Sequence, residues 1–205
     1  MGNQLTFTGG GELDNGLNVS LSFVLDHADN DVSGFDSHSI TVSSDALGSI
    51  TVAGDGAGNA QSDLDTTAAG DIWDNAFKAG AADTKYIAMA GSDASDNSVN
   101  YTLPTLVDGL SISASYSSGG AAIDSTTAFA ATYTGVEGLS VSYGVGENGS
   151  TTATTSGDVT TMKASYAIGS FTAAVSNTES DKDSTGIDEE MDSWKLSYTV
   201  SDNLS

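Results

Sequence analysis

Acidic side chains are the residues of this chain whose types and spacing come closest to a recognisable chemistry. Residues 181–186 read DKDSTG, and Asp188 follows two places later. Oxygen-bearing side chains at alternate positions before a glycine are typical of a calcium-binding loop, whose ligands here would be Asp181, Asp183, Thr185 and Asp188. Such loops usually join two helices, whereas this segment joins two stretches with β character. Two interpretations therefore stand side by side, a calcium site and an acidic loop exposed to solvent.

Other catalytic patterns are weak. His27 and His38 are the two histidines, and an Asp/His hydrolase would need such groups within hydrogen-bonding distance of each other and of a water. Nothing in the sequence brings them together. The glycine-rich residues 54–59 (GDGAGN) lack the lysine that follows in a phosphate-binding loop, and the chain has no cysteine for thiol chemistry. We therefore expect a protein that is not an enzyme and has no cofactor other than calcium.

The charge of the chain is strongly one-sided. There are 28 acids against five basic residues, all lysines, and the formal net charge is −23. A chain without a basic patch does not bind nucleic acid through phosphates. The acids suit either a solvated surface in a saline habitat or a channel whose field attracts cations.

The elements that would position these residues repeat along the chain. A short turn such as Asn15-Gly16, Asp108-Gly109 or Glu137-Gly138 is followed by alternating apolar and small polar residues, as in LNVSLSFVL after Gly16. This alternation predicts antiparallel hairpins. We expect about eleven strands and the start of a twelfth. Their predicted ranges are 5–13, 17–25, 39–44, 49–54, 98–103, 110–117, 126–134, 139–146, 159–167, 170–178 and 191–200.

The connections alternate in length. Short turns are separated by longer polar loops at about 27–38, 55–97, 118–125, 147–158 and 179–190. Only 38% of the residues are hydrophobic, and one face of each strand is rich in Ser and Thr. Short turns on one rim and long loops on the other predict an all-β, antiparallel, up-and-down transmembrane β-barrel with an apolar outside and a wet inside. Tyrosines at 116, 133, 143, 166 and 198 would form its interfacial aromatic girdle.

On these segments the chain resembles the general diffusion porins of Gram-negative bacteria, particularly the alphaproteobacterial type. The similar parts are GELDNGLNVSLSF, ITVSSDALGSITVAGD, VDGLSISASY, VEGLSVSYG and SDNLS. The resemblance implies an outer-membrane barrel of about sixteen strands, of which about 11–12 are present here in a single domain, 1–205. It also implies a homotrimer in contact with the lipid bilayer and lipopolysaccharide, and passage of small hydrophilic solutes.

In that family a long loop folds inward and narrows the pore, and the loop at about 55–97 corresponds to it. The loop would contain a short helix through Ala69–Phe77. Its charged residues would line the constriction: Asp55, Asp63, Asp65, Asp71, Asp74, Asp83, Lys78 and Lys85. Relatives oppose the acids of this loop with a basic cluster on the wall, and this chain has no arginine to form one. We therefore expect a cation-preferring pore, because charged rings set selectivity.

A second interpretation is a secreted adhesin or surface-layer protein built from acidic β-repeats, with or without stabilising calcium. The two interpretations differ in one observation, because the porin would need detergent and conduct in bilayers, whereas the adhesin would be soluble without detergent.

Overall fold

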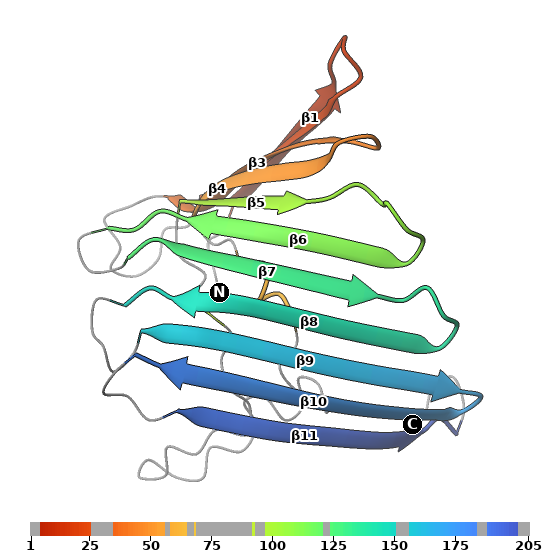
Figure 1. Ribbon diagram of the computed structural model, residues 1–205. Coiled ribbons are helices and arrows are strands. Elements are labelled where there is room, and N and C mark those ends of the chain that lie inside the picture. Colours follow the sequence, from red (N-terminus) through yellow and green to blue (C-terminus); the bar gives the residue numbers. More distant parts are fainter. Residues whose placement is uncertain are drawn as a thin grey trace.

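The computed structural model describes residues 5–25, 35–55, 58–64, 68, 92, 97–120, 124–150, 156–183 and 188–200, with no side-chain description at 35, 36 and 55. The described residues form eleven strands in one antiparallel sheet whose spatial order is the chain order (Figure 1). The strands are β1 Leu5–Glu12, β2 Asn18–Leu25, β3 Phe35–Ser44, β4 Gly48–Asp55, β5 Ser98–Thr102, β6 Leu110–Ser117, β7 Thr126–Tyr133, β8 Leu139–Asn148, β9 Gly157–Ile168, β10 Phe171–Lys182 and β11 Glu189–Tyr198. The predicted all-β, up-and-down sheet and its eleven strands are confirmed.

The short turns owe their shape to glycine. Gly109 and Gly138 end two of these turns with φ of 77° and 76°, a left-handed conformation that other residues rarely adopt. At Gly109 a side chain would also approach the backbone of Thr134 and Gly135. The repeated acidic-Gly motif of the sequence is therefore the turn that reverses the chain at one rim of the sheet.

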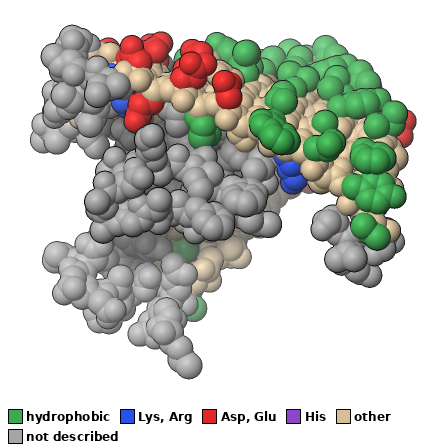
Figure 2. All heavy atoms as spheres, turned by 90° about the horizontal axis from the view of Figure 1, so that it is seen from below, with side chains coloured by type: hydrophobic (Ala, Val, Ile, Leu, Met, Phe, Trp, Pro, Cys, Tyr) green, Lys and Arg blue, Asp and Glu red, His purple; other side chains and the backbone are tan. Residues whose placement is uncertain are grey.

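The register gives the sheet two chemically different faces. Val141, Ala164, Val175 and Trp194 are cross-strand partners on β8 to β11, and they lie on the convex face. The next row, Ser142, Lys163, Ser176 and Ser193, lies on the concave face. Apolar side chains cover much of the convex surface in Figure 2. Large apolar groups there are exposed, Val175 at 57% and Trp194 at 78%, so the sheet turns its apolar face outward.

The apolar band crosses the strands obliquely. Towards the long loops it ends at Val145 on β8 and at Trp194 on β11, whereas the register partner of Val145 on β11 is Glu190. The band edge is thus displaced along the strands by four residues, roughly 14 Å, over three strand spacings of about 4.8 Å. The edge is therefore inclined by roughly 45° to the direction perpendicular to the strands. At the other rim, Tyr198 is displaced by four residues from the row of Tyr133 over four spacings, or roughly 35°. Strands of membrane barrels tilt by about 35–45°, so a level membrane would cut this sheet along such a band.

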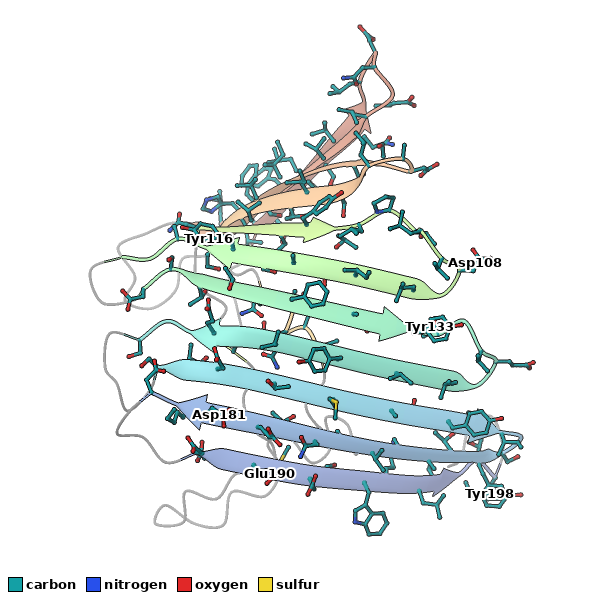
Figure 3. All side chains as sticks on the ribbon, in the orientation of Figure 1. Asp108, Tyr116, Tyr133, Asp181, Glu190 and Tyr198 are labelled. Carbon is teal, nitrogen blue, oxygen red and sulfur yellow. The ribbon has the colours of Figure 1, made fainter. Side chains whose placement is uncertain are left out.

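Aromatic residues mark the short-turn rim. Tyr133 and Tyr198 lie at this end of their strands in Figure 3. Tyr166 is two residues from the same end of β9, and 46% of its surface is exposed. Tyr116 lies at the long-loop end instead. Tyr143 lies in the middle of β8, so the prediction that it belongs to a rim was wrong. Within the described part of the chain, no helix has the length and apolarity needed to cross a membrane.

Candidate functional site

The described part of the long loop lies on the concave face and crosses the strands. Its backbone is hydrogen-bonded to side chains of β5, β6 and β11. Asn100 on β5 donates to the Gly58 carbonyl (3.0 Å), and Ser115 on β6 accepts from the Ala60 amide (2.7 Å). Farther along, Ser193 on β11 accepts from the Ala68 amide (3.0 Å). The loop residues 58–64 and 68 therefore run along the inner wall from β5 to β11.

A buried hydrogen-bond node joins this segment to Ser92, which lies on the other side of the loop in sequence. The Gln61 side chain is fully buried, and its Nε2 donates to Thr161 Oγ1 of β9 (3.0 Å) while its Oε1 accepts from the Ser92 amide (2.5 Å). Asn59 Nδ2 donates to Ser92 Oγ (3.0 Å). Thr161 Oγ1 in turn lies 3.1 Å from Thr178 Oγ1 on β10. Two loop segments and two wall strands are thus held by one set of buried polar groups.

The wall beneath the node consists of very small residues. Ala128 and Ala130 of β7 are buried against Ala60, and Leu64 packs on the same cluster. The neighbouring concave positions on β8 are Gly144 and Gly146, where an added Cβ would meet loop side chains. Small wall residues therefore let the loop approach the backbone of the sheet.

Asp63 is the predicted constriction residue whose side chain the structure describes. It lies in this wall-bound segment, and its amide donates to the Asn59 carbonyl (3.0 Å). The residue as a whole is exposed, but partial desolvation of its carboxyl raises the pKa above the usual value of 3.8. The remaining predicted residues, and the predicted helix Ala69–Phe77, lie outside the described residues: Asp65, Asp71, Asp74, Asp83, Lys78 and Lys85, together with the side chain of Asp55.

Strand parity separates most of the charges of β8 to β11, an arrangement that was not predicted from the sequence. Lys163 and Lys195 occupy concave positions, each two residues towards the short turns from a loop anchor, Thr161 and Ser193 respectively. Six acids occupy convex positions towards the long loops: Glu147, Asp158, Glu179, Asp181, Glu190 and Asp192. Figure 2 shows acids at one end of the convex face and lysine beneath it. The wall thus has a basic pair without any arginine, and the alternation of residue types was the signal that could have revealed it.

The predicted calcium ligands do not converge among the residues that the structure describes. Asp181 lies on the convex face, and Asp188 Oδ1 accepts from the Lys182 amide (2.9 Å). Across the described ranges, no group of three or more His, Cys, Asp or Glu side chains is arranged to hold a metal ion. Thr185 lies outside these ranges, and the calcium site stays a prediction.

Comparison with known proteins agrees with this geometry. The anion-selective porin from Comamonas acidovorans matches over 96% of this chain and 64% of its own, with 19% identity and a TM-score of 0.58. Salmonella typhi OmpF, solved in complex with daunomycin, matches over 96% of this chain and 66% of its own, with 15% identity and a TM-score of 0.59. The chain therefore spans less than two thirds of the length of either porin. At these identities the similarity shows the shared β-barrel fold.

Sequence comparison supplies the family. No curated protein matches the sequence significantly. A family model described as Gram-negative porin matches residues 1–203, which is nearly the whole chain. Together with the outward apolar face and the loop on the inner wall, this match shows that the chain belongs to the Gram-negative porin family and is an outer-membrane protein.

Proposed function

We propose that the protein forms a water-filled channel through which small hydrophilic solutes and ions diffuse passively. The observation that carries this proposal is the division of the sheet, because apolar side chains face outward while hydroxyl-bearing side chains and the described part of the long loop occupy the concave face. A lumen lined by such groups keeps water and solvates polar solutes. Membership of a family of channels also confirms that the protein is not an enzyme.

The composition of the concave wall supports a polar passage. On β6 its concave positions are Ser111, Ser113, Ser115 and Ser117. On β2 and β3 they include Ser20, Ser22, Ser39 and Thr41. These side chains are too small to fill a barrel, and they offer hydrogen bonds to water. A secreted adhesin would have no need for an exposed apolar band that follows the strand tilt of a membrane barrel.

We propose further that the channel prefers cations. The loop sequence between residues 55 and 97 carries more acids than lysines, and the acids on the convex face of β8 to β11 surround the long-loop end of the wall. A field of this sign raises the local concentration of cations at the mouth. Lys163 and Lys195 oppose that preference on the concave face, so we expect a moderate selectivity.

Planar-bilayer recording of the full-length protein tests both proposals. Stepwise conductance increases in KCl support the channel, and their absence would refute it. The sign of the reversal potential in a KCl gradient then reports selectivity. The variant Lys163→Gln/Lys195→Gln should move the reversal potential towards stronger cation preference. Anion preference in the unaltered protein would overturn the selectivity proposal and leave the channel intact.

We also propose that the protein works as a homotrimer embedded in lipopolysaccharide and phospholipid, as the family resemblance implies. The molar mass of the detergent-solubilised protein, measured by light scattering with the detergent contribution subtracted, tests the trimer. A mass equal to a single protomer would refute it.

A further inference from the structure

Two glycines on β8 shape the wall where the long loop is held. Gly144 and Gly146 share the concave face with Ser142, and both lie under loop side chains. Glycine inside a strand weakens the strand and often marks the close approach of another backbone. We propose that Gly144 and Gly146 form a socket, the loop socket, which fixes both ends of the long loop on the wall and so sets the pore constriction. The inference rests on the proposed channel function and names the residues that position its narrowest part.

The space above Gly146 is filled from both sides of the loop. A Cβ at this position would collide with Ser92 Oγ and would lie 2.8 Å from Ser92 Cβ and 3.0 Å from Gln61 Cβ. Ordinary van der Waals contact begins at about 3.4 Å, so the loop would have to move away from the wall. Both Ser92 and Gln61 belong to the buried node, with exposures of 3% and 0%. Moving either side chain away from a new methyl group would break hydrogen bonds of the node.

A Cβ added at Gly144 would also meet loop side chains, but these can move away more easily. A Cβ there would lie 2.6 Å from Leu64 Cδ1 and 3.4 Å from Gln61 Cγ. Leu64 Cδ1 is the end of a flexible side chain that can change rotamer, whereas the atoms above Gly146 are close to the loop backbone. We therefore expect Gly146→Ala to disturb the loop more than Gly144→Ala.

Not every glycine inside a strand is covered in this way, although Gly10 of β1 would also meet the backbone of Val19, at 2.9 Å. Gly9 and Gly11 also lie inside a strand, β1, and neither would meet any atom within 4 Å if it carried a Cβ. The socket thus differs from glycines that are merely tolerated in the sheet. Gln61 links the loop to the socket, because its side-chain amide joins the wall at Thr161 to the returning segment at Ser92. Residues 61 and 92 are 31 positions apart, so the segment between them is closed at its base.

Disulfide formation tests the placement directly, because the chain has no cysteine of its own. In the full-length double variant Ser92→Cys/Gly146→Cys the two Cβ atoms are close enough for a disulfide after a small adjustment. We expect nearly complete cross-linking under mild oxidation, detected on a non-reducing gel after protease cleavage between the two positions. The pair Ser92→Cys/Gly120→Cys is the matched control, because a side chain at Gly120 would meet nothing within 4 Å, and it should not cross-link. Equal cross-linking of both pairs, or none in the first, would overturn the socket.

Single-channel recording tests the consequence. Gly146→Ala should shift the conductance outside the wild-type distribution and increase open-channel noise, Gly144→Ala should do so less, and Gly9→Ala should match the wild type. An unchanged β-sheet circular-dichroism spectrum controls for folding. If the wild type conducts and Gly146→Ala behaves like Gly9→Ala, the socket does not set the constriction. If no variant conducts while the first cysteine pair cross-links, the channel proposal fails and the loop placement stands.

Discussion

A charge introduced on the convex face tests whether this face contacts lipid or water, because its effect on stability differs between the two environments. Val141 lies in the apolar band of β8 with 41% of its surface exposed, between its partners Tyr133 and Ala164. Replacing it with arginine costs about 2–4 kcal/mol if the site faces the bilayer midplane, and about 0–1 kcal/mol near the interface. Val141 is one outward position from the end of the strand at Leu139, and its partner Tyr133 marks the rim, so we expect about 1 kcal/mol. The same exposed valine in water could be replaced within about 0.5 kcal/mol.

Ser140→Arg is the matched control, because Ser140 is adjacent on the same strand and faces the concave side. An arginine there reaches lumen water and should cost little. Equilibrium urea unfolding of the full-length protein in phospholipid vesicles, followed by tryptophan fluorescence, measures both free energies. A cost for Val141→Arg no larger than that for Ser140→Arg would refute the assignment of the convex face to lipid.

Three further predictions concern side-chain interactions. Thr161→Val removes the acceptor of the fully buried Gln61 amide and should lower the free energy of unfolding by about 1–3 kcal/mol. Thr132→Val should lower it less, because the Thr132 hydroxyl is only partly buried beside Ser142. The same urea titration measures both variants. Because the pKa of Asp63 is raised by burial, its contribution to stability falls as pH rises from 3.8 through the higher folded value. Asp63→Asn should therefore flatten the pH dependence of unfolding in that window, and an unchanged profile would contradict the burial. Glu147 Oε2 accepts from both the amide (2.6 Å) and the hydroxyl (2.8 Å) of Thr127, so Glu147→Ala should accelerate hydrogen exchange of the Thr127 amide and Glu147→Gln should largely preserve it.

The strands could be read from the sequence because their signal is local. In β8 the residues Leu139, Val141, Tyr143 and Val145 alternate with small residues, and this period of two is a direct property of a strand with two different environments. The glycine turns then fix which strands pair. Consecutive pairing in a meander needs no long-range information, and the predicted ranges agree with the observed ones to within a few residues at each end.

The position of the loop could not be derived in the same way. Its contacts join residues far apart in sequence, 100 positions for Gln61 with Thr161 and 125 for Ala68 with Ser193. They are single polar contacts made by common residue types, so no periodicity records them. Gly144 and Gly146 were the available signal, since two glycines on one face of a strand indicate that something packs closely against it.

The net charge of −23 does not show how the charges are distributed between the two faces of the sheet. It suggested an acidic pore without basic residues on the wall, but strand parity assigns the lysines and most acids of β8 to β11 to opposite faces. The acids are tolerated on the convex face because the apolar band ends there. Asp192 is one outward position beyond Trp194, and the same carboxylate at residue 194 would lie in hydrocarbon. In the proposed channel, the charges that face the lumen, Lys163 and Lys195 among them, would therefore influence selectivity along its length, and the convex acids would act on solutes only at the mouth, through their long-range field.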